Sequence, residues 1–221
     1  MLILALDTST DKGSLALVDG ERVLAESLLE SPGTYLSRMM PGIEALMAAT
    51  GRSLEELGAV AVSQGPGNFT GLRIGLATAK ALAWSLGCPL VAVPTLEAMA
   101  AQFPFQPQPV GVLSDAKRQE VFFGLFLLKG EFPEVLQDPV RLAWRDVSAR
   151  LRPPMLLTGP GLEVYAGALT AEGLSPEILL APAEMRHPRA ATVARLALRR
   201  LKEGRTASPR QLAPMYLRPA L

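Results

Sequence analysis

The segment VSQGPGNFTGLRIGLATAKALAW, residues 62–84, contains the glycines that a phosphate-binding turn would need. An apolar run leads through them into a helical pattern, and the free amides at the start of a helix can hold a phosphate. The Walker A spacing is not met, because five residues separate Gly65 from Gly71 and no Lys follows. In the dinucleotide-binding pattern, Thr70 stands where the third glycine is required. We therefore favour a structural turn in which Asn68 or Thr70 caps the helix.

Carboxylates end two apolar runs, and they are the next candidates for chemistry. Asp7 ends the first run and Asp115 ends a similar run in the second half. Asp7 could hold a hydrated metal ion, and Thr8 and Ser9 could line a phosphate, which is the chemistry of phosphoryl transfer. The same residues also make an ordinary polar turn between two strands, so both interpretations stay open.

Hydrolytic chemistry finds little support in the residue types. The chain contains one histidine, His187, and one cysteine, Cys88. A metallohydrolase needs clustered ligands, and a Ser-His-Asp triad would have to use the same His187 without a nucleophile motif. We expect no catalytic residue, no metal site and no disulfide.

The helical part of the glycine-rich segment carries small residues at regular spacing. Gly71, Gly75, Ala79 and Ala83 recur every four residues, so they form one ridge with almost no side chains. A second helix could approach such a ridge more closely than usual. Close packing would offset the cost of about 1 kcal/mol for each glycine in a helix.

An earlier helical pattern offers an apolar stripe rich in methionine. Methionine adapts its shape, which suits a surface that meets another protein. Packing on the chain's own sheet explains the stripe equally well. The residues of this stripe that we assign to a partner surface are Leu36, Met39, Met40, Ile43 and Met47.

Composition points to a globular protein of the cytoplasm. No run reaches the eighteen or so apolar residues that a membrane span requires, and the N-terminus lacks the layout of a secretory signal. Residues 186–221 contain nine Lys or Arg and one acidic residue. This basic end could contact RNA, although a solvated helix face is the more ordinary explanation.

Alternation and turn signals predict a meander of strands followed by strands that alternate with helices. Asp19-Gly20 reads as a hairpin turn between the second and third strands. The expected strands are 2–7, 13–19, 22–29, 58–63 and 90–93, and the expected helices are 34–49, 69–86 and a short one capped by Thr95.

The second half repeats this order. Lys129-Gly130-Glu131 stands where Asp19-Gly20-Glu21 stood, and Gly159-Pro160-Gly161 matches Gly65-Pro66-Gly67. A proline-rich connector, residues 103–109, separates the copies. We predict an α/β protein with two β-β-β-α-β-α-β-α lobes, 1–102 and 110–221, the second ending in the basic helix and tail. This is the layout of the actin, Hsp70 and sugar-kinase superfamily (ASKHA, ribonuclease H-like), in which two such lobes flank a cleft and the two acidic strand ends look toward a nucleotide.

Several segments together resemble the TsaB (YeaZ) family over essentially the whole chain. They are LALDTST at 4–10, SQGPGNFTGLRIGLATAKALA at 63–83, PLVAVPTLEAMA at 89–100, DAKRQEVFFGLF at 115–126 and PMYLR at 214–218. The resemblance implies a non-catalytic paralogue of TsaD, which transfers threonylcarbamoyl to an adenosine beside the tRNA anticodon. TsaD holds a metal partly through two histidines on its first long helix, and the corresponding TYLSRMMPGIEAL has none.

The resemblance also implies partners. TsaB proteins pair with TsaD through the first two helices, work with the ATPase TsaE, form homodimers in isolation and meet tRNA mainly through the complex. It places Leu36, Met39, Met40, Ile43 and Met47, with Gly71, Leu72, Gly75 and Ala79, on the TsaD-binding surface. No resident cofactor is expected. Asp7, Thr8, Ser9 and Asp115 would be remnants of a nucleotide site, which leaves room for weak or interface-dependent nucleotide binding.

Three other functions compete with this one. An ATP-dependent kinase or chaperone-like ATPase of the same superfamily would bind ATP and Mg²⁺ through Asp7. A glycoprotease-type peptidase would need ligands that the chain lacks. Direct tRNA binding by the basic end would depend on Arg195, Arg199 and Arg200.

Overall fold

The computed structural model describes residues 1–30 and 35–217. They divide into two compact units, each built on one five-stranded sheet. The first unit contains Met1–Ala98 and Pro188–Met215, and the second contains Met99–His187.

The sheet of the first unit begins as an antiparallel meander and continues with parallel strands, in the order β3-β2-β1-β4-β5. Gly20, with φ of 60°, makes the predicted turn between β2 and β3. Residues of β1 are buried on both faces, as expected for a central strand covered by helices on each side. The strands are β1 (Leu2–Asp7), β2 (Lys12–Asp19), β3 (Arg22–Glu30), β4 (Ala59–Gly65) and β5 (Leu90–Pro94).

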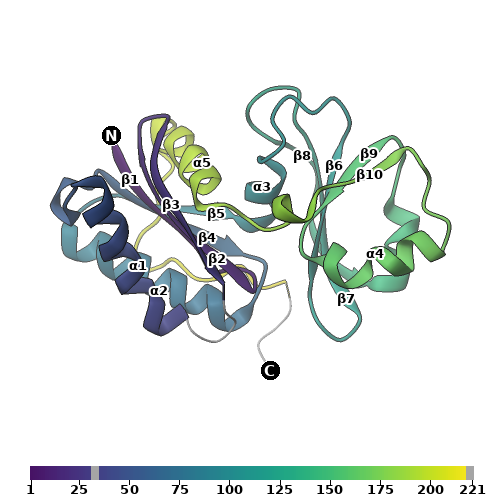
Figure 1. Ribbon diagram of the computed structural model, residues 1–221, viewed down its shortest axis with the longest axis horizontal. Coiled ribbons are helices and arrows are strands. Elements are labelled where there is room, and N and C mark those ends of the chain that lie inside the picture. Colours follow the sequence, from purple (N-terminus) through teal and green to yellow (C-terminus); the bar gives the residue numbers. More distant parts are fainter. Residues whose placement is uncertain (31–34, 218–221) are drawn as a thin grey trace. The chain divides into compact units, whose positions relative to one another are not determined.

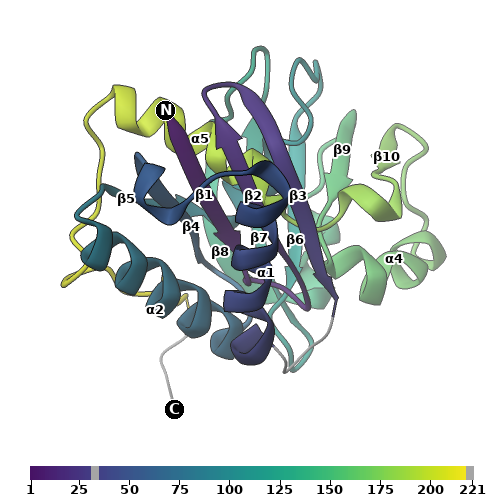
Figure 2. The same cartoon turned by 60° about the vertical axis from the view of Figure 1, so that its left-hand side comes forward.

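Helices α1 (Tyr35–Thr50) and α2 (Phe69–Leu86) lie side by side on one face of this sheet (Figure 1). Helix α5 (Ala190–Lys202) covers the other face (Figure 2). The predicted helix start at Thr34 lies outside the described residues. Asn68 caps α2 by accepting a hydrogen bond from the Gly71 amide at 2.9 Å, and Gly87 ends it with φ of 64°. A short 3-10 turn (Leu54–Glu56) and helix α3 (Thr95–Ala100) complete this half.

The second sheet repeats the first in its strand order. Its order is β10-β9-β6-β7-β8, which matches β5-β4-β1-β2-β3 strand for strand. The predicted duplication of the sheets is therefore confirmed. The strands are β6 (Val110–Asp115), β7 (Glu120–Leu127), β8 (Glu134–Ala143), β9 (Met155–Thr158) and β10 (Ile178–Leu180).

The helices of the second copy differ from the prediction. Two 3-10 turns, η2 (Trp144–Asp146) and η3 (Ser148–Arg150), stand where the first helix of this copy was expected. The connection is short, and Pro153-Pro154 follows at once, so an α-helix has no room to form. Helix α4 (Gly161–Ala171) follows β9, and a 3-10 turn (Ala183–Met185) follows β10.

The basic C-terminal helix was expected in the second lobe, and this assignment is wrong. Helix α5 buries its apolar face on the first sheet, and its first amides are held by residues of β2 and β3. The Ala190 amide donates to Ser14 Oγ at 2.8 Å, and the Ala191 amide donates to Glu26 at 3.1 Å. Apolar burial together with these two caps places α5 in the first unit.

Among residues 1–30 and 35–217, no helix combines the length and the apolar character needed to cross a membrane.

Candidate functional site

The turn after β1 was the first candidate for nucleotide chemistry, and the structure buries it. Asp7, Thr8 and Ser9 are at most 2% exposed. The Asp7 carboxylate accepts hydrogen bonds from the Ser9 amide at 3.1 Å and the Ser9 hydroxyl at 3.0 Å. Tyr35, the first residue of α1, also contacts this turn, and its hydroxyl donates a hydrogen bond to the Thr10 carbonyl at 2.7 Å.

Burial controls the protonation of Asp7. Loss of solvation raises the pKa of this carboxyl to about 6, against the opposing effect of the nearby Ser63 hydroxyl and the Ser9 amide and hydroxyl. Ser63 acts through proximity, since its Oγ forms no hydrogen bond of good geometry within the described chain. Asp7 is therefore a buried acid held by neutral groups.

The glycines of α2 explain why this turn is closed. A Cβ atom added at Gly71 or Gly75 would collide with Thr8, and one added at Gly67 would collide with the Ser9 carbonyl. Thr8 also donates from its hydroxyl to the Gly71 carbonyl at 2.7 Å. The small ridge of α2 thus packs on the chain's own β1–β2 turn. The expectation that Gly71, Gly75 and Ala79 receive a foreign helix is wrong.

Two of the amides at the start of α2, where a phosphate could bind, already have partners. The Asn68 amide donates to the Ser9 carbonyl at 2.7 Å, and the Gly71 amide donates to the Asn68 side chain. The hydrogen bond to the Asn68 side chain confirms the predicted cap of α2. In the second unit, Asp115 ends β6 as predicted, and its carboxylate pairs with Lys117 at 2.8 Å.

Most of the predicted partner stripe is also internal. Met39, Ile43 and Met47 belong to the core of the first unit, together with Leu72 and Ala79. Leu36 and Met40 remain on the surface, with exposed fractions of 78% and 40%. Of the nine residues assigned to a partner, these two are the ones exposed to solvent, and their role in binding stays a prediction.

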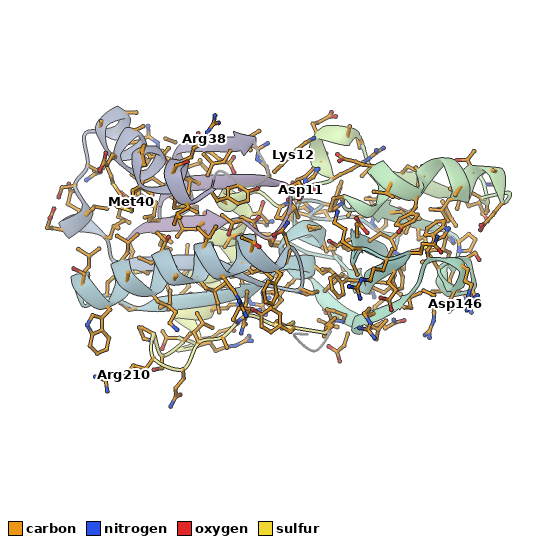
Figure 3. All side chains as sticks on the ribbon, turned by 90° about the horizontal axis from the view of Figure 1, so that it is seen from below. Asp11, Lys12, Arg38, Met40, Asp146 and Arg210 are labelled. Carbon is orange, nitrogen blue, oxygen red and sulfur yellow. The ribbon has the colours of Figure 1, made fainter. Side chains whose placement is uncertain are left out.

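A different surface is exposed on the same two helices. We call it the outer face of α1 and α2. Figure 3 views the molecule from the side on which both helices lie and labels Met40 and Arg38 on α1. The Arg73 guanidinium lies 3.8 Å above the Phe69 ring, and Ala77 and Ala81 continue this line without large side chains. The outer face consists of Leu36 and Met40 from α1 with Phe69, Arg73, Ala77, Ala81 and Trp84 from α2.

Comparison with known proteins identifies the family. The family profile described as TsaD, tRNA N6-adenosine threonylcarbamoyltransferase, matches residues 33–220. The tRNA threonylcarbamoyladenosine biosynthesis protein TsaB of Bacillus subtilis is 32% identical over 221 residues, which are 99% of this chain and 94% of that protein. This chain belongs to the TsaB family.

Solved structures agree with this membership. A Pseudomonas aeruginosa protein described as similar to peptidase YEAZ is 27% identical, with a TM-score of 0.85 over 98% of this chain and 99% of that one. The activator of 2-hydroxyisocaproyl-CoA dehydratase from Clostridium difficile shares only the fold, at 14% identity and a TM-score of 0.53 over 92% of this chain and 97% of that one. The predicted superfamily fold is thereby confirmed for this TsaB chain.

The C-terminal segment of this TsaB chain packs on the first unit, which the sequence did not reveal. The Ala207 amide donates to the Leu90 carbonyl at 2.8 Å, and the Met215 amide donates to the Gln64 carbonyl at 2.8 Å. Lys80 donates to the Leu212 carbonyl at 3.0 Å, and the Leu212 side chain contacts the core. Proline-rich, irregular segments carry no periodicity, so only their contacts reveal where they pack.

Three basic residues of α5 are engaged within this TsaB chain. Arg200 binds Glu97 at 2.6 Å and is only 13% exposed, while Arg199 binds Glu203 at 2.8 Å. Arg195 also takes part in an interaction. This arrangement weakens the alternative in which α5 binds tRNA directly. His187 pairs with Glu163 at 2.9 Å, and the described residues contain no group of three or more His, Cys, Asp or Glu able to hold a metal.

Proposed function

We propose that this chain is a non-catalytic subunit of tRNA threonylcarbamoyladenosine biosynthesis that binds TsaD through the outer face of α1 and α2. Membership of the TsaB family supports the pathway, since the relatives carry that name. The resemblance of the first two helices to the TsaD-binding helices of the family supports the partner. In this proposal the chain needs no cofactor, TsaE joins the complex and tRNA is met through it.

The observation that carries the proposal is the exposure of apolar side chains around a line of small residues. Leu36 is 78% exposed and Trp84 is 60% exposed, which are high values for large apolar side chains. Ala77 and Ala81 lie between Phe69 and Trp84 on α2, and their short side chains do not project from the helix. A partner helix can therefore approach closely there. Such a surface favours burial against another protein.

The geometry around Asp7 supports a non-catalytic role. The carboxylate is enclosed by the β1–β2 turn and α2, and the nearby Asn68 and Gly71 amides bind the chain's own carbonyl and side-chain oxygens. A phosphate would have to displace these contacts. A kinase mechanism would therefore require this turn to open.

The test is the affinity of the chain for purified TsaD, measured by isothermal titration calorimetry. Ala77→Arg places a long cation on the outer face, and it keeps a good helix former at an exposed position. We expect the affinity of this variant for TsaD to fall by about tenfold or more, because the new charge must be buried or the partner must move away from α2.

The matched control is Ala168→Arg, the same change at an exposed position of α4 in the second unit. It should leave the affinity unchanged. Equal binding by both variants and the natural chain, with unaltered circular dichroism, would refute the outer face as the TsaD site.

A further inference from the structure

The tip of the β6–β7 hairpin in the second unit has an unusual backbone. Lys117, Arg118 and Gln119 are three consecutive residues with left-handed φ values of 61°, 54° and 59°. Glycine adopts this conformation without strain, whereas side chains with a Cβ atom rarely do. Such outliers concentrate at functional sites. The tip therefore carries two cationic residues where glycine would be the unstrained choice.

The surrounding residues hold this tip in place. The Lys117 amide donates to the Asp115 carboxylate at 2.8 Å, and the Ala116 amide donates to the Glu120 carbonyl at 2.9 Å. The Trp144 amide, at the start of η2, donates to the Gln119 carbonyl at 2.8 Å. This last hydrogen bond ties the tip to the exposed Arg145 and Asp146.

Some cations at this surface have an acidic partner, and others have none in the part of the chain that the structure describes. Lys117 pairs with Asp115 at 2.8 Å, and Arg141 pairs with Glu120 at 3.3 Å. Arg118 and Arg145 are exposed, and within residues 1–30 and 35–217 neither side chain has a hydrogen-bond or ion-pair partner.

One exposed acidic residue, Asp146, directly follows Arg145 in the chain. It lies at the surface of the second unit in Figure 3.

An aromatic pair lies beside these cations. The Trp144 and Tyr165 rings are stacked, with centroids 4.3 Å apart and planes 8° from parallel. Both rings are partly buried against the core of the second unit. Burial raises the pKa of Tyr165, the nearby Asp115 carboxylate raises it further and the Lys117 cation opposes the change. The tip, the aromatic pair and Arg145 thus form one connected surface.

We infer that this surface, which we call the hairpin-tip site, contacts the single-stranded loop of a tRNA. Unpaired guanidinium groups bind phosphates, and planar aromatic and guanidinium groups stack on unpaired bases. An acidic protein would use the cations but would have no need of the stacked rings. The inference rests on the proposed role in tRNA modification and adds a direct RNA contact from the second unit.

The experiment measures binding of an unmodified tRNA transcript to the complex of this chain with TsaD, at several salt concentrations. Arg118→Gln and Arg145→Gln should each weaken binding about threefold to tenfold. Each should also lower the slope of log K against log salt by about 0.9, the loss of one phosphate contact. Lys129→Gln removes the same charge from the far end of β7 and should change neither quantity.

Two further variants separate recognition from stability. Arg118→Gly relieves the left-handed backbone, so the melting temperature should rise by roughly 1–3 °C while tRNA binding still weakens. Asp146→Asn removes the opposing charge and should strengthen binding about twofold to threefold.

The possible results distinguish an RNA contact at the hairpin-tip site from a protein contact. If Arg118→Gln, Arg145→Gln and Lys129→Gln bind tRNA alike, or if the natural complex does not bind tRNA, the inference is overturned. If the Arg variants weaken TsaD binding and leave tRNA binding unchanged, the surface serves a protein partner and the inference is also overturned. Failure of the proposed function is a separate result, since it appears as tRNA modification that continues when the chain is omitted.

Discussion

Asp7 shows at the scale of one residue how a catalytic residue type can serve structure. Its partners, the Ser9 amide and hydroxyl, are neutral, and burial raises its pKa from 3.8 to about 6. The folded state therefore binds a proton more tightly than the unfolded state. Its contribution favours folding at low pH and is lost as the pH rises through the interval from 3.8 to about 6.

The Asp7→Asn substitution tests this linkage. At pH 7 the variant should be more stable than the natural chain by about 3 kcal/mol, the equivalent of about two pKa units. Below about pH 3 the two should be nearly equal, because Asp7 is then protonated in both states. Urea unfolding of both proteins across this range measures the difference. A difference that does not change with pH would contradict the buried, unpaired carboxylate.

Gly75 supplies a second prediction about a single residue. Gly75→Ala should destabilise the protein by about 1–3 kcal/mol, because the added methyl group collides with Thr8. Gly167→Ala is the matched control: it lies within α4 with open space at its Cβ position, so it should stabilise by about 0.5–1 kcal/mol. Thermal or urea unfolding would show the two changes, and a stabilised Gly75→Ala variant would refute the close packing of α2 on the turn.

At the scale of elements, strands and helices could be predicted better than their outward faces. Strand ends at Asp7 and Asp115, the Asp19-Gly20 turn and the Asn68 cap all follow from local chemistry. The side of α2 that faces solvent could not be predicted, because small residues lie on both sides of it: Gly75 and Ala79 are buried, whereas Ala77 and Ala81 are exposed. The packing of α5 and the C-terminal segment depends on contacts between residues far apart in the sequence, which no local pattern encodes.

The C-terminal segment should contribute to the stability of the first unit. Leu212→Ala removes a half-buried side chain from the core contact and should lower the free energy of unfolding by about 1–2 kcal/mol. Leu179→Ala, at a leucine that is 55% exposed on β10, should stay within about 0.5 kcal/mol of the natural chain. Equal effects in urea unfolding would mean that the segment does not stabilise the core.

At the scale of the whole molecule, the two units have sheets of the same strand order and differ in the elements that follow the meander. The meander of the first unit leads into α1, whereas the meander of the second leads into η2 and η3. Within the described parts of the chain, the first unit alone presents a pair of long helices with exposed apolar side chains. In our proposal TsaD therefore binds the first unit, and the hairpin-tip site that we infer to contact RNA lies on the second.

The most direct measurement is threonylcarbamoyladenosine formation on a tRNA transcript in a reconstituted reaction, with this chain omitted or titrated. The account predicts no product without the chain, and an Ala168→Arg variant that acts like the natural protein. Half-maximal product with Ala77→Arg should need roughly tenfold more chain, because only the affinity for TsaD is reduced. Product that forms equally well without the chain, or equally well with Ala77→Arg at every concentration, would contradict a subunit that acts by binding TsaD through α1 and α2.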